Sequence, residues 1–205
     1  MLSHLQQRRE KEKAARRKTI LQAALQVFGS QGYHGTRMDA IAEIAQLGKA
    51  TLYYYFKSKD ELLLAILEDG IREFFLLLEQ AWQQVATPLE KLEQIPYVGA
   101  RFFSEHPDYF KLYHYLTAHP TLREKALAQL HPLIAEKIRN IRDLFDRAIA
   151  NGTIQPIPAE VLTEIFGSLI MGMGLFTHPP VTWEKLETRA RYIWQIFLEG
   201  IKNKS

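Results

Sequence analysis

The sequence contains no cysteine among its 205 residues. This absence excludes disulfide bridges, cysteine-ligated zinc or iron–sulfur sites and a thiol nucleophile, and it fits a reducing compartment. A chain of this length can bury most of its apolar surface and fold without such cross-links. Hydrophobic residues at 47% and charged residues at 24% indicate a globular protein that is neither disordered nor fibrous.

Long uncharged stretches are also missing. The longest run without Asp, Glu, Lys or Arg extends from Ile165 to Trp183, and its apolar part ends near Thr177. That part is about thirteen residues long, whereas a membrane-spanning helix needs roughly twenty. The N-terminal residues lead into dense charge without the apolar segment of a secretory signal. We therefore predict a soluble cytoplasmic protein with no membrane partner.

Signatures of strands and of catalysis are absent as well. No Asn-Gly or Asp-Gly turn stands between alternating apolar runs, and Asn151-Gly152 follows a helical segment. The sequence has no His-Glu-x-x-His, Gly-x-Ser-x-Gly, P-loop or dinucleotide-binding motif. The seven histidines form no i, i+4 pair with a flanking acid. We expect no enzymatic activity, metal or cofactor, and keep a helical enzyme only as an alternative.

The patterns that are present predict helices throughout. Apolar spacing predicts a first helix from about Glu12 to a stop at Gly29. Three residues are each followed three positions later by an acid, as in a capping box that begins a helix: Thr36, Ser58 and Thr87. Pro96 and Pro132 are expected to kink or divide their helices. The later helices are predicted at about 58–86, 88–105, 107–119, 121–150, 158–176 and 182–202.

Charge is distributed unevenly along the chain. Residues 1–65 contain eleven Lys or Arg and six acids, a balance of +5; of the chain's 26 bases and 23 acids, fifteen and seventeen remain for residues 66–205, a balance of −2. This asymmetry suggests a module that faces a polyanion, joined to a nearly neutral body. For the basic arm at Arg8–Lys18 a solvated helix face is an equally good explanation, because Glu10 and Glu12 are interleaved there.

Residues 36–56 have the proportions of a helix-turn-helix motif, with two short helices at Met38–Ala45 and about 49–56 separated by Gln46-Leu47-Gly48. At about 100° per residue, Leu52 and Phe56 share one face of the second helix, which must be buried. The lysine, the small alanine and two tyrosines then lie on its other faces: Lys49, Ala50, Tyr53 and Tyr54. Lysine and tyrosine can contact phosphates, and alanine lets the backbone approach the bases.

Three runs in this region closely resemble the DNA-binding domain of tetracycline-repressor (TetR) family regulators: Ile20–Thr36, Ile41–Ala45 and Lys49–Leu62. The resemblance covers about residues 16–65. It implies an all-α fold with an N-terminal three-helix helix-turn-helix DNA-binding domain at 1–65, of which 1–15 form a basic arm, and a larger helical domain at 66–205 for ligand binding and dimerisation. Gln46 replaces the family's usual turn glycine, and Gly48 replaces its usual Ser or Thr. Gly48 can still act as an N-cap, and Gln46 strains the turn if its φ is positive.

The same resemblance implies contacts with double-stranded operator DNA from a set of residues in and beside the motif: Thr36, Lys49, Ala50, Thr51, Tyr53, Tyr54, Tyr55 and Lys59. A purely structural role remains open for Tyr55, through packing beside Leu52, and for Thr36, through its cap. The basic arm either reaches neighbouring phosphates or a minor groove, or is simply solvated.

Aromatic, methionine and a few polar residues of the second domain are the candidates for an effector pocket: Arg101, Phe102, Phe103, Tyr113, His114, Met171 and Phe176. Apolar residues of the last two helices are the candidates for a two-fold interface: Phe166, Ile170, Met173, Ile193 and Phe197. An ordinary single-chain core explains either set as well. The resemblance implies a homodimeric repressor that binds a palindromic operator and is released by an apolar or amphipathic small molecule. An architectural DNA-binding protein without an effector is the alternative.

Overall fold

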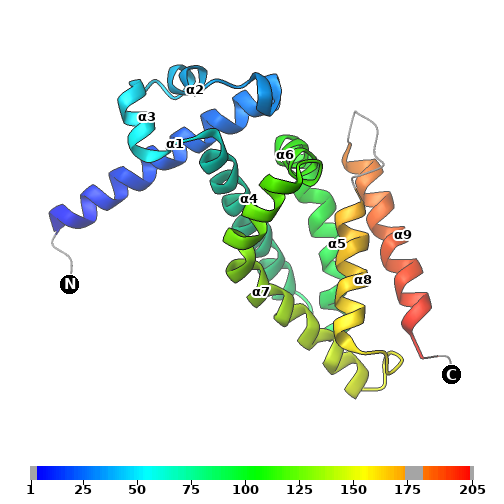
Figure 1. Ribbon diagram of the computed structural model, residues 1–205. Coiled ribbons are helices and arrows are strands. Elements are labelled where there is room, and N and C mark those ends of the chain that lie inside the picture. Colours follow the sequence, from blue (N-terminus) through cyan, green and yellow to red (C-terminus); the bar gives the residue numbers. More distant parts are fainter. Residues whose placement is uncertain (1–3, 174–181, 204–205) are drawn as a thin grey trace. The chain divides into compact units, whose positions relative to one another are not determined.

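The computed structural model describes residues 4–173 and 182–203 (Figure 1). Regular structure in these residues is α-helical, apart from one isolated antiparallel bridge between Ile154 and Lys202. The helices are α1 (His4–Gly35), α2 (Met38–Ile44), α3 (Lys49–Tyr55), α4 (Lys59–Trp82), α5 (Pro88–Glu105), α6 (Pro107–Thr117), α7 (Pro120–Ala150), α8 (Ala159–Gly172) and α9 (Trp183–Ile201). The predicted all-α fold is confirmed. None of these helices combines the length and apolar composition needed to cross a bilayer.

The described residues fall into two compact units that interleave in sequence. The first draws on Met1–Asp69 and Lys111–Ala126, and the second on Gly70–Phe110 and Leu127–Ser205. Three helices, α4, α6 and α7, therefore contribute residues to both units. The division into functional domains after residue 65 remains a prediction.

The first helix is longer than its apolar pattern predicts. It begins at His4, and Gly29 does not end it; the first non-helical residue is Gly32, with φ 69°, followed by one more turn to Gly35. The positive φ at position 32 is a conformation that glycine adopts without steric cost. The expected stop at Gly29 was wrong, because a glycine in a helix lowers its stability without ending it.

The three predicted capping boxes have three different outcomes. The Thr87 box is complete, since its hydroxyl accepts from the backbone of Glu90 and the Glu90 carboxylate accepts from the backbone of Thr87. At Ser58 the hydroxyl accepts from the backbone of Glu61, whose carboxylate accepts from the residue before, Lys57. The box at Thr36 was wrong: Arg37 is the N-cap residue of α2, with no side-chain cap.

The proline breaks were also wrong as divisions of helices. Pro96 lies inside the continuous helix α5, and Pro132 lies inside the 31-residue helix α7. A proline removes one backbone donor and crowds the preceding turn, but burial of the apolar face can outweigh that cost. Pro96 is itself buried, as are Leu92 and Ile95 beside it.

The first unit is built on apolar side chains from its N-terminal helices. Fully or almost fully buried residues are Ile20, Val27 and Phe28 of α1, Ile41 of α2, Leu52 of α3 and Leu62 of α4. Burying a side chain of this size contributes about 1.5–3 kcal/mol relative to exposing it. Leu52 thus anchors α3 in the unit and fixes which of its other side chains face outward.

The second unit has a core in which four of the five predicted interface residues lie. Phe166 and Ile170 of α8 and Phe197 of α9 belong to one buried cluster, and Met173 belongs to a neighbouring one. Ile193 is partly buried and packs against both clusters. Four of the proposed contacts are therefore occupied by the chain's own side chains. Other residues of α8 and α9 must supply any surface for a partner.

Candidate nucleic-acid interface

The turn between α2 and α3 is a Schellman motif. The backbone N–H of Leu47 donates to the carbonyl of Ala42 at 2.9 Å, and that of Gln46 donates to Glu43 at 3.0 Å. This pair of bonds satisfies the last carbonyls of α2 and reverses the chain. The motif places a left-handed residue at Gln46, whose φ is 54°. The predicted strain at this position is thus confirmed, since a non-glycine residue occupies a site that favours glycine.

The following helix begins at Gly48, as predicted. Gly48 is the N-cap of α3, and its carbonyl accepts from the backbone of Thr51 at 2.9 Å and of Leu52 at 3.1 Å. At the other end, the backbone of Phe56 donates to Leu52 at 2.9 Å. Both Leu52 and Phe56 are buried. The short helix is therefore fixed by its own backbone bonds and by two apolar anchors on one face.

The remaining faces of α3 carry the predicted DNA-binding residues. Lys49, Ala50, Tyr53 and Tyr54 are exposed, and 68% of Tyr54 is accessible. The ring of Tyr54 meets that of Tyr55 edge to face, with centroids 5.3 Å apart. An exposed helix carrying a cation, two phenol groups and a small residue has the shape and chemistry to enter a major groove.

Lys49 is held by an ion pair within the motif. Its ammonium lies 2.6 Å from a carboxylate oxygen of Asp39, in the first turn of α2. The pair connects the two helices of the motif at the exposed start of α3. Because both side chains are accessible to water, the pair contributes little to folding stability and can open when a phosphate approaches.

The other predicted contacts occupy positions with structural partners. Thr36 is only 2% exposed, and its hydroxyl donates to the carbonyl of Gly32 at 2.7 Å, which ties it to the end of α1. Thr51 and Tyr55 are half-buried. The ammonium of Lys59 donates to the carbonyl of Tyr33 at 2.9 Å. Their roles in DNA binding remain predictions, and the structure gives each of Thr36 and Lys59 a role in fixing α1.

Two basic residues next to the motif did not enter the predicted set. Arg37 is exposed directly before α2. Lys57 is exposed just after α3, where its ammonium donates to the carbonyl of Tyr53 at 2.7 Å. Their signal in the sequence is a cation at each outer end of a helix-turn-helix, which places positive charge where the backbone of bound DNA would pass.

A polar and aromatic cluster fixes the end of α1 to the start of α4. The hydroxyl of Tyr33 donates to the carboxylate of Asp60, and this bond lowers the pKa of Asp60, with Lys125 and Lys59 adding to the effect. Burial, and next the bond to Asp60, raises the pKa of Tyr33. The ring of Tyr33 stacks on that of Tyr115, with centroids 4.6 Å apart. The cluster thereby supports the helices from which the motif projects.

The predicted effector residues are divided between the two units. Arg101, Phe102, Phe103 and Met171 belong to the second unit, whereas Tyr113 and His114 belong to the first. Arg101 is exposed and pairs with Glu105 at 2.9 Å. Met171 is exposed on α8, and burial raises the pKa of the half-buried Tyr113. Phe176 lies outside the described residues.

Phe102 is the buried centre of an aromatic group in the second unit. Its ring lies 4.9 Å from that of His106 and 5.6 Å from those of Phe103 and Tyr109. Phe74 of α4 completes the group at 6.0 Å. These rings are packed on one another, which is what an apolar core requires and also what lines many apolar ligand sites.

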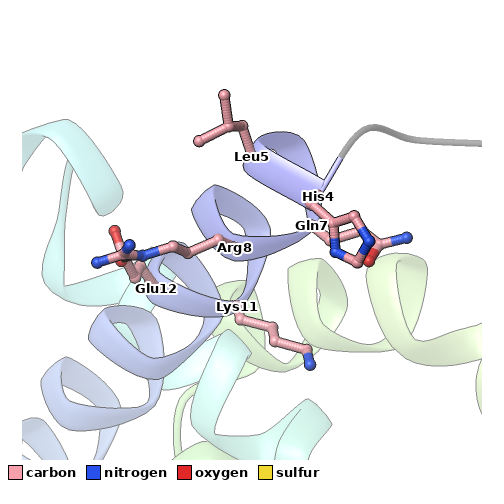
Figure 2. Close-up of a pocket in the computed structure, with 6 residues that line it drawn as sticks. All are labelled: His4, Leu5, Gln7, Arg8, Lys11 and Glu12. Carbon is pink, nitrogen blue, oxygen red and sulfur yellow. Dashed lines mark hydrogen bonds and ion pairs between the residues drawn. The ribbon is translucent and has the colours of Figure 1, made fainter.

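The surface of the first unit has hollows away from these residues. One is lined by α1 alone: His4, Leu5, Gln7, Arg8, Lys11 and Glu12 (Figure 2). A single helix cannot enclose a ligand, so this hollow is open surface. Another is lined by Tyr33, Asp60, Tyr115, His119, Pro120, Thr121, Leu122 and Lys125. Neither includes a predicted effector residue. No group of three or more metal-ligating side chains is present in the described residues.

Comparison with known proteins connects this geometry to a family. The family model described as bacterial regulatory proteins of the tetR family matches residues 20–66. The HTH-type transcriptional regulator RutR of Escherichia coli strain K12 is 30% identical over 164 residues, which cover 78% of this chain and 75% of RutR.

Two solved structures are similar over most of their length. PfmR, a TetR family transcriptional regulator from Thermus thermophilus, has a TM-score of 0.68 and 26% identity, with 88% of this chain and 97% of PfmR covered. AibR, solved in complex with isovaleryl coenzyme A and operator DNA, has a TM-score of 0.70 and 23% identity, with 88% of this chain and 97% of AibR covered. The matched segment of the family model, 20–66, includes the whole of α2 and α3.

Proposed function

Because this chain belongs to the TetR family of helix-turn-helix transcriptional regulators, we propose that it represses transcription by binding a palindromic operator as a homodimer, and that an apolar or amphipathic small molecule releases it. The observation that carries the proposal is α3, which is anchored by Leu52 and presents Lys49 and Tyr54 to solvent. In a major groove these side chains reach phosphate oxygens and base edges.

The proposed DNA contacts follow from exposure. Tyr53, Tyr54 and Ala50 face the groove, Lys49 exchanges its Asp39 partner for a phosphate, and Arg37 neutralises a second phosphate at the start of α2. Thr51 and Tyr55 lie at the edge of this surface. Thr36 and Lys59 act by holding α1 in place, with Lys59 close enough to the surface for a phosphate contact.

The proposed dimer uses side chains of α8 and α9 that the chain leaves uncovered. Val161, Ile165 and Leu169 are exposed at intervals of four on α8, and Tyr192 and Ile196 are exposed at the same interval on α9. Ile196 is 70% accessible. Since residues four apart share one helix face, each helix presents an apolar stripe, and a two-fold axis brings such stripes against their own copies.

The proposed mechanism of release depends on spacing. Two α3 helices must enter half-sites about one DNA turn apart, roughly 34–36 Å. An effector that binds more tightly to a dimer with another spacing lowers the operator affinity by that difference in affinity. The aromatic group around Phe102 favours an apolar ligand, and the acyl group bound by the similar protein AibR is of that class.

Selection of bound sequences from a random DNA pool tests the proposal. The wild type, Lys49→Ala and Tyr54→Ala are compared with Arg139→Ala, which removes an exposed cation of α7 in the second unit. We expect a palindromic consensus for the wild type and Arg139→Ala, and its loss in the other two variants. A folded wild type that enriches no sequence at moderate salt would overturn the proposal and favour an architectural role.

The dimer is tested separately by sedimentation equilibrium. Ile196→Asp places a charge in the proposed apolar stripe, whereas Leu127→Asp places the same charge on an exposed apolar position of α7. We expect Ile196→Asp to dissociate the dimer and Leu127→Asp to leave it intact. Dissociation by both variants, or by neither, would place the interface elsewhere.

Mass spectrometry of ligands that purify with the protein tests the effector class. Apolar or amphipathic compounds that weaken binding to the selected operator are expected. Recovery of only small hydrophilic metabolites, with no effect of apolar compounds on operator binding, would contradict this part of the proposal.

A further inference from the structure

The N-terminal part of α1 is a helix without a tertiary partner. Every residue from His4 to Arg16 is exposed, and the first buried residue of the helix is Ile20. At 1.5 Å per residue this projection is about 20 Å long. We call residues His4–Arg16 together with Lys18 the arm. Figure 1 shows α1 continuing beyond α3 toward the N-terminus of the chain.

The arm and its base carry cations that the protein does not neutralise. Arg8 pairs with Glu12 at 2.9 Å, and Arg17 pairs with Asp69 at 3.6 Å. Figure 2 shows Arg8 directed to Glu12 and Lys11 projecting away from that pair. Within the described part of the chain, the other five basic residues form no ion pair: Arg9, Lys11, Lys13, Arg16 and Lys18.

These cations are divided between two sides of the helix. At about 100° per residue, Arg9, Lys13 and Arg16 form one stripe, and the buried residues Ile20 and Val27 continue it. The stripe therefore extends the side of α1 that packs in the helix-turn-helix unit. Lys11 and Lys18 lie on the opposite side of the helix, about 180–200° from Arg9.

The arrangement is unfavourable for the free protein. A solvated helix of about three turns has little stability of its own, and the like charges of Arg9 and Lys13, four residues apart, lower it further. Phosphates would neutralise both groups and remove the repulsion. Double-stranded DNA supplies one charge per about 1.7 Å of its axis, so a cationic stripe of this length finds several phosphates within reach.

We propose that the arm lies along the phosphate backbone of the DNA flanking the half-site that α3 reads, with Arg9, Lys13 and Arg16 as its contacts. The inference rests on the proposed operator binding by α3 and adds to it a second contact surface that is independent of base sequence. It continues the interface of the motif, because arm and motif belong to one compact unit. Its contribution is to affinity and to salt dependence, and not to the choice of operator.

The test compares two charge-neutralised variants on two DNA lengths. The first variant is Arg9→Gln/Lys13→Gln/Arg16→Gln, and the matched control is Lys11→Gln/Lys18→Gln on the opposite side. Each is titrated against the selected operator with ten-base-pair flanks and against the operator trimmed to its half-sites, over a series of salt concentrations. Circular dichroism and thermal unfolding verify that each variant is folded.

On flanked DNA we expect the triple variant to bind more than tenfold more weakly at about 0.1 M salt. Its slope of log affinity against log salt is expected to be shallower by up to about 2.7 per arm, which is three phosphate contacts at about 0.9 each. The control is expected to keep the wild-type slope, and on trimmed DNA all three proteins are expected to bind alike. The selected sequence is expected to be the same for all three.

An unchanged slope of the triple variant on flanked DNA would overturn the inference. A loss in the control per charge removed as large as that in the triple variant would also overturn it, since that result reports net charge and not a contact surface. In either case a wild type that still prefers its operator over a scrambled duplex leaves the proposed function standing. A wild type without that preference would instead contradict the proposed function.

Discussion

The ammonium of Lys49 lies 2.6 Å from the carboxylate of Asp39, so the first residue of α3 is paired with the first turn of α2. The acid holds the lysine side chain at the exposed start of α3. It also offsets the positive charge that a phosphate would meet there. Asp39 is thus expected to limit binding to DNA of every sequence while it positions the lysine.

We predict opposite effects for the two members of this pair. Asp39→Asn removes the competing carboxylate and is expected to raise the affinity for a scrambled duplex a few-fold. Lys49→Ala is expected to weaken binding to every duplex and to make the salt slope shallower by about 0.9, the value of one phosphate contact. Fluorescence anisotropy titrations over a salt series measure both. Weaker binding of Asp39→Asn to the scrambled duplex would contradict this role of the acid.

The turn at Gln46 predicts a stabilising substitution. A left-handed conformation costs a residue with a side chain roughly 1–2 kcal/mol, and glycine avoids that cost while losing more chain entropy. We expect Gln46→Gly to raise the free energy of unfolding by up to about 1 kcal/mol, and Gln46→Ala to give no such gain. Urea denaturation measures both variants. A destabilised Gln46→Gly protein would show that the Gln46 side chain makes a stabilising contact.

Gly70 and Tyr109 predict a destabilising substitution in the second unit. A Cβ atom at Gly70 would lie 2.5 Å from Cε1 of Tyr109, which is too close for the ring to stay in place. Gly70→Ala is expected to lower the free energy of unfolding by about 1–3 kcal/mol, the usual cost of overpacking. Gly200→Ala is the control, because an added Cβ there meets nothing within 4 Å and gains up to about 1 kcal/mol of helix propensity. Equal effects of the two substitutions in urea denaturation would contradict the close approach of Tyr109.

Asp60 predicts how stability depends on acid pH. The hydrogen bond from Tyr33, followed by Lys125 and Lys59, lowers the pKa of Asp60 below its ordinary value of 3.8. A carboxyl group whose pKa is lower in the folded state stabilises it fully at pH values above the unfolded pKa, and this contribution is lost as the pH falls through the folded pKa. We expect Asp60→Asn to be less stable than the wild type at neutral pH and to lose less stability on acidification.

Urea denaturation between about pH 2.5 and 6 measures this difference. The gap between wild type and Asp60→Asn is expected to be constant above about pH 4 and to narrow below it. A gap that stays constant through the acid range would show that the carboxylate of Asp60 has no favourable partner in the folded protein.

The motif was predictable because its signals are local. The spacing of Leu52 and Phe56 fixes the buried face of α3, and the departure from glycine at Gln46 marks the strained turn. The role of Thr36 was not, since a threonine followed three residues later by an acid reads as a cap for α2, whereas its hydroxyl bonds to the end of the preceding helix. Arg37 escaped notice because a single cation before a helix has no periodic pattern.

The second unit was less predictable because apolar periodicity does not say what covers a face. Phe166 and Phe197 have the spacing of an interface, but the chain's own helices bury them, with their ring centroids 4.7 Å apart. The exposed stripe on α8 and α9 became identifiable only once the core was known. Likewise, the length of α1 beyond Glu12 has no apolar signal, because that part of the helix packs against nothing in the first unit.

The central claim is that the exposed face of α3 reads DNA sequence. The most direct measurement is the ratio of affinities for the selected operator and for a scrambled duplex of the same composition, at fixed moderate salt, for the wild type and Tyr54→Ala. The account predicts a ratio of about 10³ or more for the wild type, and a ratio reduced at least tenfold in Tyr54→Ala with its thermal unfolding unchanged. A ratio near one for the folded wild type, or an unchanged ratio in Tyr54→Ala, would contradict it.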